Sequence, residues 1–311
     1  MAGQIVLKSQ NAINDISELP DISYYINRVI EDGGVIYDMS KLLEVFQFIY
    51  EKNINDSEVF SAVNPAWGIK YDLASGNVSK LYSLFDPAGD LTVTAVTFQV
   101  KLNNDLPVPT IYLGGSMNTY LKSLGVIADV ENFGMATAYS VPVLQSYGGN
   151  QSFAIGLLYS KSEHDAHDPN GPSSPYIAAT SVLSRPDSNN TNLPSWTNFF
   201  GSYGATGSVG SNVVTGYENA KPLSCYGDAN SLMAFRNGSL VTSDNTVTQL
   251  PTQKKNLGYW FGSSVTPTGQ QAASYFLGHL IENWVLVNTT SQKMAEVSKR
   301  INDKYYAVIP H

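Results

Sequence analysis

The sequence predicts a mainly β protein, a β-sandwich or jelly roll with a helical segment at each end of the chain. Between residues 57 and 287 the helical period is lost, and short runs rich in Val, Ile, Tyr, Phe and Thr alternate with Gly, Asn, Ser, Asp and Pro. Asn237-Gly238 stands between alternating apolar residues, which is a strong signal for a hairpin with a type I′ turn. The 311 residues are 43% hydrophobic, which is enough for a sizeable core.

Charge is scarce and its balance is acidic. Only 14% of the residues are charged, and 18 Lys and Arg against 26 Asp and Glu give a net charge of −8. This balance argues against nucleic acid or an anionic membrane as the main partner. No apolar run is long enough for a transmembrane helix, and the start MAGQIVLKSQ lacks the apolar core of a signal peptide. With Cys225 as its one cysteine, the chain cannot form an intrachain disulfide or a zinc site of two cysteines.

The first 56 residues are predicted to form a charged, helical segment. Residues 20–32 place apolar side chains at helical spacing and end at two glycines. Residues 38–52 repeat this pattern, and Asp38 is a candidate N-cap. Since isolated short helices are marginal, these apolar faces must pack on each other, on the rest of the chain or on another subunit. We expect residues 1–56 to serve as an anchoring or assembly segment.

Residues 57–311 are expected to form the sandwich and to end in a helix. Near the end of the chain, Met294, Val297 and Ile301 make one apolar stripe at helical spacing. The opposite side of that helix is expected to carry Lys293, Lys299, Arg300 and Lys304. Two stretches rich in turn residues, 161–175 and 185–212, are predicted to be long surface loops.

Three stretches of the chain together resemble bacteriophage virion proteins that carry a concanavalin A-like domain. The first resembles the head of tail-fibre and other surface-exposed structural proteins, through Gly33, Gly34, Lys70, Lys80, Leu81, Tyr82, Ser83, Leu84, Pro87, Gly89, Asp90, Leu91 and Thr92. The second, LSCYGDANSLMAFRNGSLV, is similar to a hairpin of laminin-G-like sandwiches. The third is similar to the last strands and terminal helix of such domains, through Gly258, Gly262, Gly278, Leu280 and Glu282.

This resemblance implies a concanavalin A-like (laminin-G-like) jelly-roll sandwich over residues 57–311. It also implies a place in the virion, after assembly in the host cytoplasm, with contacts to other virion proteins through the N-terminal helices. The fibre analogy suggests a homo-oligomer, with a trimer as the form that fibres favour. Fold alone does not decide what such a protein does.

The densest polar cluster of the sequence spans residues 163–171. Asp165, Asp168 and Asn170 could supply oxygen ligands to Ca²⁺, whereas His164 and His167 would favour a transition metal. The same residue types also build an ordinary solvated turn, and no spacing selects between the alternatives. Ca²⁺ is therefore an optional ligand of this cluster, and no other cofactor is expected.

Aromatic residues gather within residues 185–212, among Asn, Ser and Gly. They are Trp196, Phe199, Phe200 and Tyr203. Aromatic faces beside uncharged hydrogen-bonding groups suit sugar rings, and the same composition suits a protein partner. Alternatively, Trp196 and Phe199 pack under the loop as a satellite core. The residues alone leave the three interpretations open.

The sequence shows no recognisable machinery for glycoside hydrolysis. Such an enzyme needs two carboxylates across a cleft, and the E-x-D-x-x-E strand pattern of fold-related glucanases is missing. Glu282 is interpreted as a structural acid at a strand edge, His279 as a satisfied or exposed histidine, and Cys225 as a buried thiol. The sequence therefore favours a non-enzymatic virion structural protein that displays its sandwich in a fibre, decoration or receptor-binding role. The alternatives are a glycan-binding lectin module for host adsorption and, less favoured, a polysaccharide-degrading enzyme.

Overall fold

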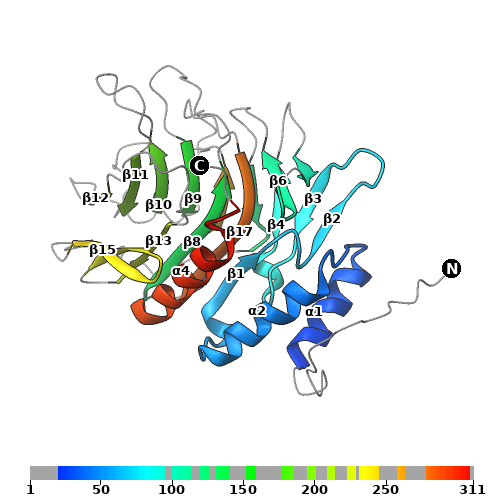
Figure 1. Ribbon diagram of the computed structural model, residues 1–311, viewed down its shortest axis with the longest axis horizontal. Helices are drawn as coiled ribbons and strands as arrows, with labels where there is room; N and C mark the ends of the chain where they lie inside the picture. The colour runs from blue at the N-terminus through cyan, green and yellow to red at the C-terminus, as the bar shows by residue number, and fades with distance from the viewer. Residues whose placement is uncertain are drawn as a thin grey trace, which may run out of the picture.

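Two antiparallel β-sheets form the body of the described part of the chain, and the three α-helices described there pack against them (Figure 1). The computed structural model describes residues 20–94, 100–104, 106–113, 120–125, 131–140, 152–158, 177–184, 195–200, 209–213, 223–228, 231–244, 258–262 and 278–308. The predicted fold class, a mainly β sandwich with helices at both ends, is confirmed. None of the helices within these ranges is long and apolar enough to cross a bilayer.

Sheet A has nine strands in the order β12-β11-β10-β9-β16-β7-β4-β3-β2. In chain order they are β2 (Ile69–Tyr71), β3 (Val78–Leu81), β4 (Leu91–Thr94), β7 (Tyr120–Ser123), β9 (Ser152–Leu158), β10 (Ile177–Ser184), β11 (Ser195–Phe200), β12 (Val209–Val213) and β16 (Gly258–Gly262). Each strand pairs with its neighbours in antiparallel fashion, so strands far apart in the sequence, such as β7 and β16, lie side by side.

Sheet B has eight strands in the order β15-β14-β13-β8-β17-β6-β5, and β1 also pairs with β17. They are β1 (Val59–Val63), β5 (Lys101–Asn103), β6 (Thr110–Leu113), β8 (Phe133–Ser140), β13 (Leu223–Gly227), β14 (Leu232–Arg236), β15 (Ser239–Asp244) and β17 (Gly278–Val287). The longest strand, β17, is central because β8 lies on one side of it, and β1 and β6 lie on the other. Its position makes it the organising strand of this sheet.

Two of the three described helices begin directly after a capping residue. The three helices are α1 (Pro20–Glu31), α2 (Met39–Glu51) and α4 (Ser291–Tyr305). Asp38 caps α2 by accepting hydrogen bonds from the Ser40 and Lys41 amides, as predicted, and the Thr290 side chain accepts from the Lys293 amide at the start of α4. The α1 helix ends at Gly33, whose φ of 76° is the left-handed conformation typical of a helix C-terminus.

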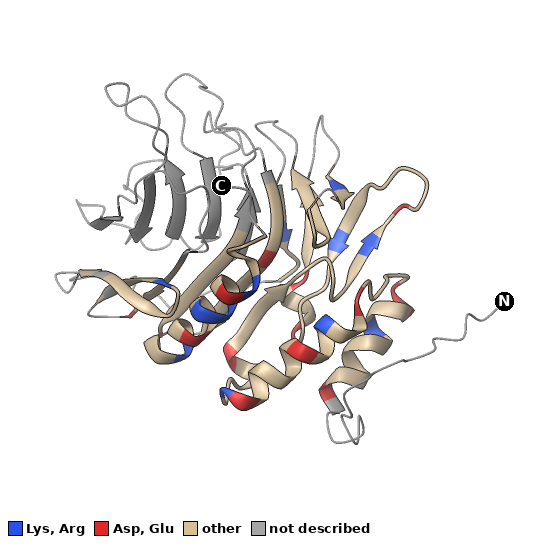
Figure 2. Cartoon of the chain, in the orientation of Figure 1, with Lys and Arg blue, Asp and Glu red and all other residues tan. Residues whose placement is uncertain are grey.

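The helices α2 and α4 lie on the outer face of sheet B. The side of β8 that faces α4 carries Gly134, Ala136 and Ala138, and Gly134 lies against Met294 of α4. These small residues let the helix approach the sheet closely. Salt bridges join the two helices, on which Figure 2 colours the charged residues: Lys52 pairs with Glu296 at 2.9 Å, and Lys304 pairs with Glu44. The molecule is therefore layered as sheet A, sheet B and a pair of helices.

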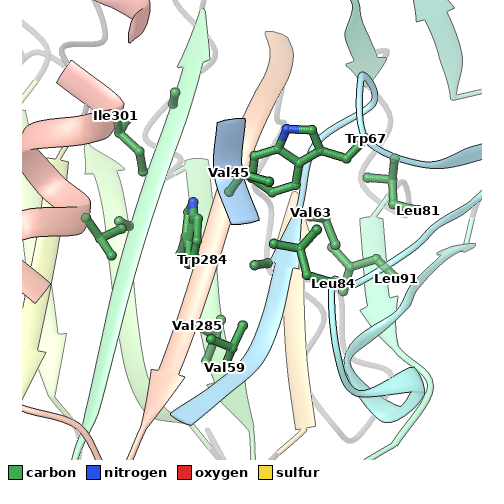
Figure 3. Close-up of a cluster of buried hydrophobic side chains, with 14 of the residues drawn as sticks. Val45, Val59, Val63, Trp67, Leu81, Leu84, Leu91, Trp284, Val285 and Ile301 are labelled. Atoms are coloured by element: carbon green, nitrogen blue, oxygen red, sulfur yellow. The ribbon is translucent and has the colours of Figure 1, made fainter. Parts of the chain in front are cut away.

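One hydrophobic core contains residues from the helices and from both sheets. Figure 3 shows Val45 of α2, Val59 of β1, Trp284 of β17 and Ile301 of α4 in the same cluster. Of the options open for the N-terminal apolar faces, the structure shows packing on the rest of the same chain. The prediction that residues 1–56 serve as an anchoring segment stays a prediction.

The hairpin predicted at Asn237-Gly238 is confirmed. It joins β14 to β15, and its two residues have φ values of 50° and 73°, as a type I′ turn requires. The prediction of one long loop over 185–212 is wrong, because residues 195–200 and 209–213 are strands. Trp, Thr and Phe fit a pleated surface well, and this preference prevails over the surrounding Asn, Ser and Gly. The predicted loop 161–175 lies outside the described residues.

Candidate functional site

The predicted aromatic site is divided by the register of sheet A. Trp196, Phe199 and Phe200 belong to β11, where Trp196 pairs with Leu183 and Phe199 pairs with Thr180. Since side chains alternate along a strand, positions 196 and 200 lie on one face of the sheet and position 199 on the other. The three positions therefore cannot form one platform, and Tyr203 lies outside the described residues.

The predicted Ca²⁺ ligands Asp165, Asp168 and Asn170 also lie outside the described residues, so that site stays a prediction. Within the described ranges, no three His, Cys, Asp or Glu side chains are grouped as metal ligands.

A single cross-strand row runs over all nine strands of sheet A. Successive pairings give one line of positions, Lys70, Lys80, Thr92, Lys122, Trp260, Gly156, Thr180, Phe199 and Gly210. Paired positions lie on the same face of an antiparallel sheet. The neighbouring residue Leu121 is buried in the core while Lys122 is exposed, so this row, here called the lysine row, faces away from sheet B.

Asp32 closes one end of the lysine row. Its carboxylate accepts hydrogen bonds from Tyr82 Oη at 2.8 Å, Lys80 Nζ at 3.2 Å and Lys70 Nζ at 3.3 Å. The Tyr82 hydroxyl and, to a smaller extent, the two ammonium groups lower the pKa of Asp32 from 3.8 to about 2. Lys70 and Lys80 stand directly opposite each other on β2 and β3, and the carboxylate between them offsets their repulsion.

A second carboxylate, Asp90, fastens α1 to the sandwich beneath this end of the row. Asp90 is fully buried and accepts two hydrogen bonds of 2.8 Å from Arg28 of α1. It also accepts from the Ser83 amide at 2.8 Å and pairs with Lys80 at 2.9 Å. Gly34 completes the junction, because a Cβ there would lie 2.5 Å from the Tyr82 ring. Many of the residues that carry the virion resemblance thus meet at one junction between helix and sheet.

Glu282 and Arg300 correct two expectations from the sequence. Glu282 lies in the middle of the central strand β17, fully buried, and not at a strand edge. Arg300 lies on the buried side of α4 and pairs with Glu282, with Phe48, Trp67 and Trp284 rings 5.4–5.9 Å from its guanidinium. The spacing of apolar residues cannot predict that Arg300 is buried. Without knowledge of its partner Glu282, an arginine is assigned to the polar face of a helix.

The remaining ligands of the Glu282 carboxylate come from three parts of the chain. Trp284 Nε1 donates at 2.7 Å, Tyr305 Oη at 2.6 Å and Asn64 Nδ2 at 3.0 Å. Burial and, secondarily, the nearby Glu282 charge raise the pKa of the Tyr305 phenol well above its usual value of 10. These donors surround the Glu282 carboxylate. Its role is therefore structural, because it joins α4 to sheet B.

The lone cysteine and His279 have the environments that the sequence suggested. Cys225 is buried, and burial raises the pKa of its thiol to about 12, so the prediction of a buried thiol is confirmed. His279 is half-buried on β17, with Nδ1 3.0 Å from Thr110 Oγ1 and its ring 5.0 Å from the Tyr112 ring. This is a satisfied histidine, as expected.

The sequence patterns described above include Lys70, Lys80, Thr92 and Phe199 of the lysine row, but neither Lys122 nor Trp260. The alternation in Tyr-Leu-Lys-Ser (120–123) does place Lys122 on an exposed face. Its neighbours Thr92 and Trp260 follow from pairing with β4 and β16, which no local pattern indicates.

Comparison with known proteins gives likeness at the level of structure alone. No family model and no curated protein matches the chain. The ligand binding domain of botulinum neurotoxin serotype D, solved with N-acetylneuraminic acid, is similar with 10% identity and a TM-score of 0.48, over 81% of this chain and 52% of that one. The chain thus spans about half of the toxin structure.

Two further solved structures belong to other classes of protein. Trypanosoma rangeli sialidase, in complex with 2,3-difluorosialic acid, has 13% identity and a TM-score of 0.46, over 85% of this chain and 39% of that one. A heptameric SAP-like pentraxin from Limulus polyphemus has 10% identity and a TM-score of 0.40, over 68% of this chain and 83% of that one. Likeness at this level transfers neither a ligand nor an activity to the chain.

Proposed function

We propose that the protein is a non-enzymatic structural protein of a bacteriophage particle that displays its β-sandwich for binding. The observation that carries the proposal is the asymmetry of the sandwich. The helices α2 and α4 cover the outer face of sheet B, whereas Lys122 on β7 of sheet A is exposed. The helix-covered side of sheet B is therefore suited to contacts within a particle, and the outer side of sheet A is suited to binding a partner. The virion setting rests on the resemblance of the N-terminal junction residues.

A structural role is favoured because the buried carboxylates of Asp90 and Glu282 hold helices against the sheets. Asp90 is occupied by Arg28 and Lys80, and Glu282 by Arg300 and Tyr305. Each joins a helix to a sheet, and a catalytic acid would instead have to face a substrate across a cleft. An assay for reducing ends released from host polysaccharide tests this part; release by the purified protein would overturn it.

The virion role has a direct test in the source particle. Antibodies raised against the purified protein should label the surface of intact particles in electron microscopy. Antibodies absorbed with the protein beforehand should give no label. Absence of the chain from purified particles would contradict the proposal.

The second candidate function is a glycan-binding module for host adsorption, with or without a place in the virion. It is favoured by the lysine row, in which backbone pairing aligns the exposed Lys122 with the aromatic positions 260 and 199 of the sequence. Aromatic rings beside polar groups suit sugars. A glycan array separates this candidate from a purely architectural role. Absence of binding to every glycan on the array would count against the glycan-binding candidate.

A further inference from the structure

We propose that Asn237 is a site of spontaneous deamidation, and that docking of helix α4 sets the rate at which its side-chain amide cyclises onto the Gly238 nitrogen. The site lies at the tip of the β14–β15 hairpin, where β15 runs beside α4 (Figure 1). It is separate from the lysine row, and its chemistry does not depend on the proposed virion role.

Asparagine is a thermolabile residue, and an Asn-Gly pair can modify itself with water as the co-reactant. The Gly238 amide nitrogen loses its proton and attacks the side-chain carbonyl carbon Cγ of Asn237. The new N–Cγ bond closes a succinimide ring, the Cγ–Nδ2 bond breaks, and the amide takes up a proton and leaves as ammonia. Water then opens the ring at either carbonyl carbon, which yields aspartate or isoaspartate. Glycine favours the reaction because it has no Cβ to hinder the attacking nitrogen.

The hairpin tip exposes the amide and fixes the backbone that must react. Asn237 is exposed, so water can reach its side chain and the ring that would replace it. The two turn residues have φ values of 50° and 73°, and they connect the paired residues Arg236 and Ser239. Cyclisation requires the peptide plane between Asn237 and Gly238 to rotate until its nitrogen faces Cγ. Because this rotation changes the conformation that the type I′ turn fixes, the reaction requires the turn to open locally.

Helix α4 holds the attacking nitrogen in place. The Gly238 N–H donates to Ser298 Oγ, with 3.4 Å between the nitrogen and the oxygen. Ser298 is buried, so little water competes for this hydrogen bond. The Gly238 backbone also lies against the helix, because a Cβ there would be 2.9 Å from Lys299 Cβ and 3.2 Å from the Ala295 carbonyl oxygen. While α4 is docked, the N–H that must lose its proton is therefore held by the helix.

The isoaspartate product would not fit the turn that it replaces. In isoaspartate the main chain runs through the Cβ and Cγ of residue 237, which inserts an additional carbon into the turn. Turn length fixes the register of a hairpin, and this turn has no spare room against Lys299 and Ala295. The modified hairpin should therefore push against α4, the helix whose Arg300 pairs with the buried Glu282. Reaction at Asn237 would thus loosen the helix irreversibly.

The rate test compares the intact protein with a synthetic peptide of residues 231–244 under identical conditions, and follows Asn237 by mass spectrometry of the digested protein. An isolated hairpin is marginally stable, so the peptide reports the reaction without α4. We expect the protein to react at least about tenfold more slowly than the peptide, in proportion to the hydrogen-exchange protection of the Gly238 amide. Ser298→Ala should raise the rate in the protein about threefold, through the loss of one hydrogen bond.

The matched control is Ser291→Ala, the same substitution at the start of α4, about two helical turns before Ser298. It should leave the rate at Asn237 unchanged. Equal rates in the protein and the peptide, or equal acceleration by both variants, would overturn the proposal because α4 would exert no specific control. Absence of reaction at Asn237 in the wild type and in Ser298→Ala, after the peptide has reacted completely, would also overturn it.

The product test separates the longer backbone from the added charge. Protein that carries isoaspartate at position 237, isolated by ion exchange, should melt at a lower temperature and show reduced hydrogen-exchange protection of α4. Freshly prepared Asn237→Asp adds the same charge without extending the main chain. Because aspartate tolerates a positive φ, this variant should keep the wild-type protection. Unchanged protection of α4 in the isoaspartate form would overturn the coupling between the hairpin and the helix.

Discussion

At the scale of single residues, Asp32 stabilises a pair of lysines that would otherwise repel each other. Asp32→Asn is expected to lower the free energy of unfolding at pH 7 by less than about 1 kcal/mol, because solvent screens a half-exposed pair. The pKa of Asp32 is lowered from 3.8 to about 2. The ionised form is thus favoured by folding, so its contribution is complete above about pH 4 and is lost as the pH falls toward 2.

Urea denaturation of both proteins at pH 7 and near pH 2.5 measures this effect. The gap between wild type and Asp32→Asn should narrow at the lower pH. Asp303→Asn, which removes an exposed partner of Lys299 on α4, is the surface control and should change little at pH 7. An unchanged Asp32 gap at the two pH values would contradict the assignment of the pKa shift to this cluster.

The buried pair of Glu282 and Arg300 should behave in the opposite way from a surface pair. Arg300→Met is expected to cost about 3–5 kcal/mol, because it leaves a carboxylate uncompensated in the core. The double variant Glu282→Gln/Arg300→Met removes both charges and should recover part of that loss. Chemical denaturation of the wild type, both single variants and the double variant measures the coupling. Strict additivity of the single losses would show that the two groups do not interact.

At the scale of elements, the β14–β15 hairpin and α4 support each other. A Cβ at Gly238 would lie 2.9 Å from Lys299 Cβ and 3.2 Å from the Ala295 carbonyl oxygen, and the residue has a φ of 73°. Gly238→Ala should therefore combine backbone strain with displacement of α4. Gly76→Ala is the matched control, since Gly76 has the same φ of 73° and nothing within 4 Å of the added carbon.

The control variant should lose about 1–2 kcal/mol from strain alone, and Gly238→Ala should lose more. Chemical denaturation gives both values, and hydrogen exchange should show reduced protection of α4 in Gly238→Ala alone. Equal losses, with α4 unaffected, would mean that the hairpin does not hold the helix.

Local signals predicted the elements, and long-range pairing decided the site. Asp38 and the Asn237-Gly238 turn are each read from a few neighbouring residues, so the sequence was sufficient for them. The edge position predicted for Glu282 is wrong because strand order, which no local pattern contains, puts β17 at the centre of sheet B. The lysine row depends on the pairing of β7 with both β4 and β16. These pairings join segments that lie far apart in the sequence, so no local pattern predicts them.

At the scale of the whole molecule, the two ends of the chain stabilise the same core. Residues 20–56 contribute buried side chains from α1 and α2, and Phe48 of α2 packs on the Trp284 ring at 6.2 Å. A chain that begins at Ser57 would expose Trp67 and Trp284 to water and would lose the α2 partners of Lys304 and Glu296. We therefore expect this truncation to lose near-ultraviolet circular dichroism and to aggregate in light scattering, and not to yield a folded head.

Assembly through the N-terminal segment needs a test that leaves the core intact. Tyr50 of α2 is 75% exposed, so Tyr50→Ser should keep the wild-type melting temperature. If the outer face of the helices joins subunits or other virion proteins, this variant should lower the mass of the full-length protein in light scattering, or weaken its capture by particles that lack it. Exposed aromatic side chains are among the residues that such contacts favour. A folded, monomeric chain from Ser57 with the stability of the full protein would contradict the expected unfolding of the truncation, because residues 1–56 would then be a separable anchor. An unchanged mass and unchanged capture of Tyr50→Ser would contradict assembly through this face of α2.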